Sequence, residues 1–151
     1  MQNSFIADRT LIQALEQRSV SVPCSEGRIL FKQGEPPIGL YLLKTGKASL
    51  IMKTDKGQEV VHLTVGSGSI LGLPAIVGNV PYTLSAMAHH GSEVNFLARK
   101  EFEELIHAQP SLYPKVLEVL AAEVRSARLA LTGIMGKLGS RASRISPKNQ
   151  I

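Results

Sequence analysis

Glycines at short intervals divide the stretch from Arg28 to Ala86 into brief apolar runs. These glycines are Gly34, Gly39, Gly46, Gly57, Gly66, Gly68, Gly72 and Gly78. Runs such as 48–52 and 60–63 have the length of strands, and turn residues at 54–57 and 90–92 separate them from their neighbours. Many short strands with this spacing predict a double-stranded β-helix, or jelly roll, built from two packed sheets.

Helices are predicted on both sides of this roll. Leu11, Ile12 and Leu15 recur at helical spacing, which indicates a short amphipathic helix from about Ser4 to Gln17 that includes Phe5. The chain then divides into an N-terminal helix over 1–20, a β-roll over 21–98, a helical segment over 99–138 and a basic tail over 139–151. The fold is therefore expected to be mainly β with flanking α.

The helical segment contains a short helix from Arg99 that ends before Pro110, followed by a long helix with Ser111 as its N-cap and Pro114 in its first turn. Apolar residues recur on the long helix at near-heptad spacing, namely Val116, Leu120, Val124, Ala127, Leu131, Ile134 and Leu138. Such a seam favours a homodimer through this C-terminal helix, with Leu117 and Ala121 packing against the roll. The alternative is that the seam packs against its own roll.

Three ordered motifs carry a resemblance to a known family. They are the turns and strands over 34–35, 41–43 and 46–47, the glycine-rich turn V-G-S-G-S-I-L-G over 65–72, and P-Y-T-L-S-A over 81–86. From about Val22 to Leu138 the chain resembles the cyclic-nucleotide-binding domain and dimerisation helix of the Crp/Fnr transcription regulators. The resemblance implies a jelly roll whose effector-binding cassette acts on the dimer helix.

The resemblance also implies which residues form the ligand site: Gly72, Leu73, Pro74, Ala75, Tyr82, Thr83, Leu84, Ser85 and Arg128. Leu73 stands where the nucleotide-binding members have a ribose-binding glutamate, and Tyr82 stands where they have the arginine that clamps the phosphate. A phenol lacks the charged donor fork of arginine, so the sequence argues against ordinary cyclic AMP binding. Pro74 either starts the cassette helix and removes one phosphate donor, or is only a helix starter in a cassette that binds nothing.

No cofactor is fixed by the sequence; a cyclic nucleotide (cAMP or cGMP) or another small effector are the candidates. We expect L73E combined with Y82R to move the site toward cyclic AMP. Cys24 is the only cysteine, which excludes an internal disulfide, and we expect it to be a buried apolar residue. His62, His89, His90 and His107 lack the spacing of metal ligands, and no motif of a catalytic site is present, so the chain is not expected to be an enzyme.

Composition and charge limit the class of protein and the kinds of partner that the chain can have. With 44% hydrophobic and 19% charged residues the chain is globular, and neither a membrane span nor a signal peptide occurs, so a cytoplasmic protein is expected. The net charge of +5 is concentrated near the end of the chain. Residues 140–145 resemble the start of the family's helix-turn-helix domain, which the chain lacks, so DNA would be reached only through such a domain.

Two functions follow. The first is an effector-sensing regulatory domain of a Crp/Fnr-like regulator with a degenerate cassette, in which effector binding shifts the dimer helix. The second is an unliganded dimerisation module that pairs with full-length regulators as a non-DNA-binding partner. A pocket able to hold a ligand favours the first, and an interior filled by Leu73, Tyr82 and Leu84 favours the second.

Overall fold

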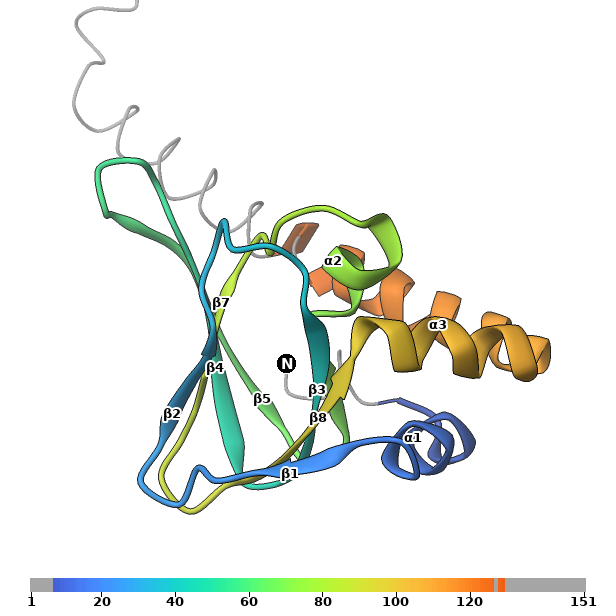
Figure 1. Cartoon of the computed structure of the whole chain (residues 1–151). Coiled ribbons are helices and arrows are strands. Elements are labelled where there is room, and N and C mark those ends of the chain that lie inside the picture. The colour runs from blue at the N-terminus through green and yellow to red at the C-terminus, as the bar shows by residue number, and fades with distance from the viewer. Residues whose placement is uncertain (1–6, 127, 130–151) are drawn as a thin grey trace, which may run out of the picture.

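A computed structural model describes residues 7–126, 128 and 129. Its strands form two antiparallel four-stranded sheets that face each other (Figure 1). One sheet has the order β1 (Val20–Val22), β8 (Glu93–Ala98), β3 (Gly39–Thr45) and β6 (Ser69–Leu71). The other has the order β2 (Arg28–Phe31), β7 (Ser85–Ala88), β4 (Lys47–Lys53) and β5 (Glu59–Gly66). The predicted jelly roll is confirmed.

The turn between β3 and β4 shows why glycine is needed where the roll is tightest. Gly46 has a φ of 94°, and a Cβ at this position would lie 2.3 Å from the Ser92 hydroxyl oxygen. That hydroxyl accepts from the Lys47 N–H at 3.1 Å and donates to the Lys47 carbonyl at 3.0 Å. The close approach of the two chains therefore depends on the missing side chain.

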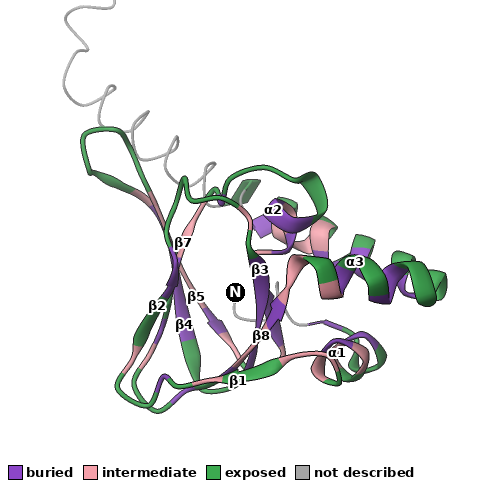
Figure 2. Ribbon diagram, viewed as in Figure 1, coloured by how far each residue is buried: buried purple, intermediate pink, exposed green. Residues whose placement is uncertain are grey.

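Strand β3 is buried on both faces, which explains its unbroken apolar run. Leu40 and Leu42 belong to an apolar cluster shared with the helices, whereas Tyr41 and Leu43 belong to the cluster between the two sheets. Buried residues accordingly line the middle of both sheets in Figure 2. The molecule has two cores, a roll interior and a helix-side core, separated by the sheet that contains β3.

The first helix begins later than predicted. Helix α1 spans Arg9–Glu16, and residues 7 and 8 are not helical; Phe5 lies outside the described residues. The Asp8 carboxylate accepts a hydrogen bond from the Thr10 N–H at 2.8 Å, which is the role of an N-cap. Leu11 and Leu15 are fully buried in the helix-side core, as their spacing predicts.

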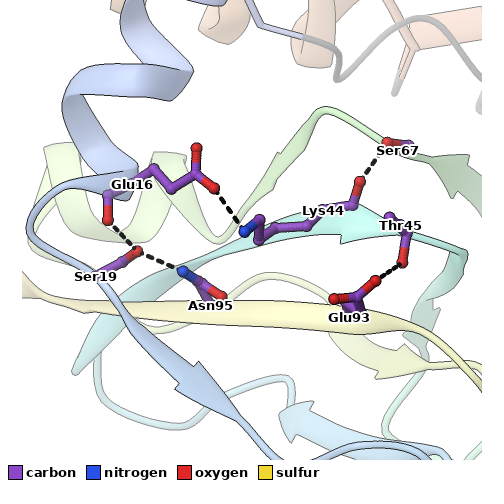
Figure 3. A network of polar contacts seen from close by, with 7 residues as sticks. All are labelled: Glu16, Ser19, Lys44, Thr45, Ser67, Glu93 and Asn95. Carbon is purple, nitrogen blue, oxygen red and sulfur yellow. Dashed lines mark hydrogen bonds and ion pairs between the residues drawn. The ribbon is translucent and has the colours of Figure 1, made fainter.

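A polar network joins the end of α1 to the sheet (Figure 3). Lys44 Nζ lies 2.6 Å from Glu16 Oε1, and the Asn95 amide donates to the Ser19 hydroxyl at 2.9 Å. Ser19 in turn donates to the Glu16 carbonyl at 2.9 Å. These contacts hold the first helix on β3 and β8.

Helix α3 (Arg99–Ala108) follows β8 and ends before Pro110, as predicted. A single 3₁₀ turn, η1 (Pro110–Leu112), then leads into an α-helix that starts at residue 113 and includes 113–126. Ser111 therefore lies inside the 3₁₀ turn and is not an N-cap, because Pro110 opens that turn one residue earlier. Pro114 does lie in the first turn of the long helix.

The long helix faces its own domain with a different side from the one expected. Val116 and Val119 are each only 4% exposed and pack in the helix-side core, and Leu120 is partly buried against it. Leu117 is 62% exposed and Ala121 is also exposed, so neither packs on the roll. The expectation for these two residues, and for Val116 as part of a free seam, was wrong.

The physical reason is that heptad spacing defines two apolar stripes on this helix and does not say which one the domain covers. Val124, 58% exposed, is the seam residue that remains available within the described helix. The seam residues Ala127, Leu131, Ile134 and Leu138 lie outside the described residues. In the part of the chain that the structure describes, no helix is long and apolar enough to cross a membrane.

Candidate ligand-binding cassette

The short helix α2 (Leu73–Gly78) sits above the open end of the roll (Figure 1). Gly72 caps it with a φ of 88°, and Pro74 lies in its first turn. A Cβ on Gly72 would lie 3.0 Å from the Tyr82 ring and 3.3 Å from the Phe31 ring. The glycine thus brings the helix start into contact with these two aromatic rings.

Leu73 does not face the space below the cassette. It is fully buried and packs in the helix-side core, together with Ile76 one turn later. Ala75, between them, belongs instead to the roll interior. The expectation that L73E with Y82R restores a nucleotide site is therefore untenable as designed, because L73E would place a carboxyl group in an apolar core.

Tyr82 occupies the position at which the resemblance implies a phosphate clamp. Its ring stacks on Phe31 with centroids 4.0 Å apart and an interplanar angle of 16°. Its hydroxyl donates to the Gly39 carbonyl and accepts from the Gly39 N–H at 3.1 Å. Its backbone N–H donates to the Glu35 carbonyl at 3.0 Å, and its carbonyl accepts from the Gly34 N–H at 2.8 Å. The side chain is only 3% exposed, so it is held in place from ring to backbone.

The space that remains beside Tyr82 is small. A cavity of about 30 Å³ lies between the cassette, the roll and the long helix. Its lining comprises Phe31, Leu50, Leu71, Gly72, Pro74, Ala75, Tyr82, Thr83, Leu84 and Glu123. A volume of this size has room for one or two water molecules, whereas pockets for small organic ligands are on the order of several hundred Å³.

The structure brings most of the predicted site residues together but not all of them. Leu73 and Arg128 are absent from the lining, and Arg128 is exposed on the long helix. Ser85 is half-buried and also absent from the lining, since its hydroxyl accepts from the Gln33 N–H at 2.9 Å. Thr83 is on the lining but exposed.

Glu123 is the functional candidate that sequence reasoning missed. It is the only lining residue from the long helix and the only carboxyl group on the lining that the structure describes. Its Oε1 atom is buried and has no hydrogen-bond partner. Three residues further along, Ser126 is 6% exposed and its hydroxyl also lacks a partner. No local signal identifies this residue, because the spacing of apolar residues on a helix does not say which side of the helix its domain covers.

Burial governs the ionisation of the groups beside the cavity. It raises the pKa of Glu123 to about 8, because an ionised carboxylate loses its hydration there. It also raises the pKa of the Tyr82 phenol, against the opposing effect of its hydrogen bonds to the backbone around Gly39. Near neutral pH the cavity is therefore lined by uncharged groups.

A second cleft, of about 260 Å³, lies between α1 and strands β3 and β6. Its charged groups, Lys44 and Glu16, pair with each other at 2.6 Å, and the Ser67 hydroxyl donates to the Lys44 carbonyl (Figure 3). The Ser69 hydroxyl donates to the Gly66 carbonyl at 2.6 Å. Since these polar groups are already paired, this cleft is a weaker candidate for a ligand than the cassette.

The other candidates from the sequence are occupied by structural contacts. Cys24 is 6% exposed, lies two residues after β1, and its thiol donates to the Ser92 carbonyl at 2.9 Å. His89 Nε2 lies 2.7 Å from the Ser49 hydroxyl. Within residues 7–126, 128 and 129, no group of three or more His, Cys, Asp or Glu side chains is arranged to hold a metal ion.

The domain is a β-roll in which two antiparallel sheets face each other, a short helix lies over their open end and a long C-terminal helix reaches this end. The family model of the cyclic nucleotide-binding domain matches residues 21–109, which is more than half of the chain. The chain belongs to this family, and the resemblance drawn from its motifs is confirmed.

Individual relatives agree with this assignment. The cyclic AMP receptor protein of Thermus thermophilus is 29% identical over 106 residues, covering 70% of this chain and 49% of that protein. The patatin-like phospholipase domain-containing protein 7 of Rattus norvegicus is 29% identical over 150 residues, covering 95% of this chain and 11% of that protein. The chain thus spans half or less of the length of these relatives.

The fold is also found in solved structures. The catabolite activator protein of Thermus thermophilus superposes with a TM-score of 0.70 at 25% identity, covering 85% of this chain and 60% of that one. A cyclic nucleotide-binding domain from Methylobacillus flagellatus superposes with a TM-score of 0.68 at 23% identity, covering 86% of this chain and 74% of that one. The second likeness speaks for the fold alone.

Proposed function

We propose that this chain is a non-catalytic, cytoplasmic regulatory domain of the Crp/Fnr type whose effector is not a cyclic nucleotide. The observation that carries the proposal is the placement of Tyr82. Its side chain fills the position of the phosphate clamp, stacks on Phe31 and is hydrogen-bonded to the backbone of Gly39. The remaining cavity of about 30 Å³ is too small for a nucleotide.

The charges at the cavity support the same conclusion. The described lining residues include one carboxyl group, Glu123, and neither lysine nor arginine. A cyclic phosphate is an anion and requires charged or backbone donors in this place. Near neutral pH the described lining residues offer this anion no cationic partner, and Glu123 would repel it once it is ionised. Both the shape and the charge of the cassette therefore disfavour a nucleotide.

In this proposal the long helix transmits the signal. Val116 and Val119 anchor it in the helix-side core, and Glu123 connects it to the cassette. A change at the cassette would alter how the distal part of the helix packs, and an effector must favour one of the two arrangements to have this effect. The residues that support this output role are thus those on the inward face of the helix.

The proposal includes a homodimer through the outward face. Tyr113, Leu117 and Val124 are 48%, 62% and 58% exposed and share one side of the helix. An apolar groove of about 210 Å³ beside α2 and α3 continues this face, since Tyr113 and Leu117 also line it. Exposed apolar stripes of this kind are typical of helix-pairing surfaces.

Sedimentation equilibrium tests the dimer. We expect the unmodified protein to be dimeric and V124E to shift the equilibrium toward monomer. V20E is the matched control, because Val20 is 61% exposed on strand β1, away from the helix. A V124E protein that remains as dimeric as the V20E protein would remove this part of the proposal.

The second candidate function is an unliganded dimerisation module that pairs with full-length regulators. The filled cassette favours it, because Tyr82 and the half-buried Leu84 leave little space inside the roll. The two functions differ in whether the helix responds to a solution condition. A helix whose packing is the same under all conditions would favour the second.

Thermal unfolding with millimolar cyclic AMP or cyclic GMP tests the exclusion of nucleotides. A ligand that binds only the native state at a hundredfold excess over its Kd adds about 2.7 kcal/mol of stability. We expect no change in midpoint for this chain, and a rise for the cyclic AMP receptor protein of Thermus thermophilus as the positive control. A comparable rise for this chain would overturn the proposal.

A further inference from the structure

Glu123 is half-buried as a residue, and one oxygen of its carboxyl group lies in an environment that ordinarily excludes charge. Its Oε1 atom is buried without a hydrogen-bond partner, on a cavity lined mainly by apolar side chains. The Ser126 hydroxyl, three residues further along on the same helix face, is buried and unpaired as well. Burying an ionised carboxylate in this way is costly, whereas a neutral carboxylic acid is tolerated far better.

Among the lining residues that the structure describes, none is a cation that could compensate this carboxyl group. Strands β2, β4 and β6, helix α2 and the segment 79–84 contribute a single titratable side chain to the cavity besides Glu123, namely the Tyr82 phenol. The charged side chains on these elements, Arg28, Lys47 and Lys53, are absent from the lining, and so are Lys32 and Glu35 in the loop after β2. On the long helix itself, Glu118, Arg125 and Arg128 are exposed, and Lys115 pairs with Asp8.

We propose that the effector of this domain is the proton, which binds to the carboxyl group of Glu123 and keeps the distal part of the helix docked on the cassette. Loss of this proton to solvent leaves a carboxylate that is stable only in water, so the segment around 120–126 is released. The inference rests on the proposed function, in which docking of this helix is the output.

The sign of the pH dependence follows from the direction of the shift. Burial raises the pKa of Glu123 from 4.5 to about 8 in the docked state, while a released helix restores the ordinary value. Below the ordinary value both states are protonated, and docking has its full strength. Between the two values docking takes up a proton, so its equilibrium constant falls about tenfold for each unit of pH. Above the upper value the loss is complete.

The near end of the helix is expected to stay in place. Lys115 Nζ lies 3.2 Å from Asp8 Oδ2, and this pairing lowers the pKa of Asp8, so Asp8 remains ionised through the same pH range. Val116 and Val119 add buried contacts that carry no titratable group. Deprotonation of Glu123 therefore frees the distal turns and leaves the start of the helix anchored.

Amide hydrogen exchange on the full chain tests the inference. After correction for intrinsic exchange rates, protection of the amides over 120–126 should fall up to about 100-fold between pH 6 and pH 8, whereas α3 should not change. E123Q should abolish this dependence, because its amide does not titrate. E118Q removes the same charge from an exposed position of the same helix and should behave as the unmodified protein.

A second measurement covers the case in which E123Q does not fold. Carbon-13 NMR titration of the glutamate carboxyl groups should show one group, assigned to Glu123, whose pKa lies well above the ordinary 4.5. Protection that does not depend on pH, a dependence that persists in E123Q, or an ordinary pKa for Glu123 would each overturn the inference. The proposed exclusion of nucleotides is tested separately: it fails if cyclic AMP or cyclic GMP raises the unfolding midpoint. The two proposals are therefore contradicted by different results.

Discussion

Replacing Tyr82 with phenylalanine isolates the hydroxyl group that fixes the cassette. The ring and its stacking on Phe31 remain, but the Gly39 N–H and carbonyl lose the group to which both are bonded. A buried polar group left without a partner costs about 1–3 kcal/mol. At about 2–4 °C per kcal/mol for a domain of this size, Y82F should lower the melting temperature by about 2–12 °C.

Circular dichroism during urea and thermal unfolding measures this change. Y113F is the matched control, because Tyr113 is 48% exposed and its loss of a hydroxyl should leave the stability within about 0.5 kcal/mol. If Y82F is as stable as Y113F, the hydroxyl does not hold the ring in place. The proposal that Tyr82 blocks the nucleotide site would then lose its main support.

Three further predictions concern the cassette and the helix next to it. G72A should destabilise the fold by about 1–3 kcal/mol in urea unfolding, because its φ is 88° and its new Cβ meets the Tyr82 ring, while G66A, with open space around it, should cost less. L73A should lower the free energy of unfolding by about 2–5 kcal/mol, and L73M should lower it by less than about 1.5 kcal/mol. If the two variants were equally stable, Leu73 would lie outside the core. Because the pKa of Asp8 is lowered, its contribution to stability is present above its ordinary pKa and is lost as the pH falls through the lowered value. The difference in melting temperature between the unmodified protein and D8N should therefore shrink from pH 7 to pH 3.

The architecture was predictable because it depends on local signals. Glycines that permit positive φ, such as Gly46 and Gly57, mark tight turns wherever they occur, and short apolar runs between them can only be strands of a packed roll. The run L-Y-L-L over 40–43 is explained by burial on both faces of β3. The ordered set of such motifs also indicates the family.

The details of the site were not predictable to the same degree. The motif alignment indicates that Leu73 and Tyr82 replace two polar anchors, but it assigns both side chains to the same pocket. In the structure the start of α2 directs Leu73 into the helix-side core and leaves Tyr82 on the cavity. The direction of each side chain depends on how the six residues of α2 are placed between the roll interior and the helix-side core. No local sequence signal specifies this placement.

The sequence by itself determined the β-roll, the order of its flanking helices, the family and the presence of Tyr82 where the resemblance implies a phosphate-clamping arginine. Only the tertiary structure decided which stripe of the long helix is covered, and with it the burial of Val116, the exposure of Leu117 and the placement of Glu123 at the cassette. Periodicity specifies the angle between side chains on one helix but not the surface that the helix meets. That surface is assembled from strands and helices far apart in the chain.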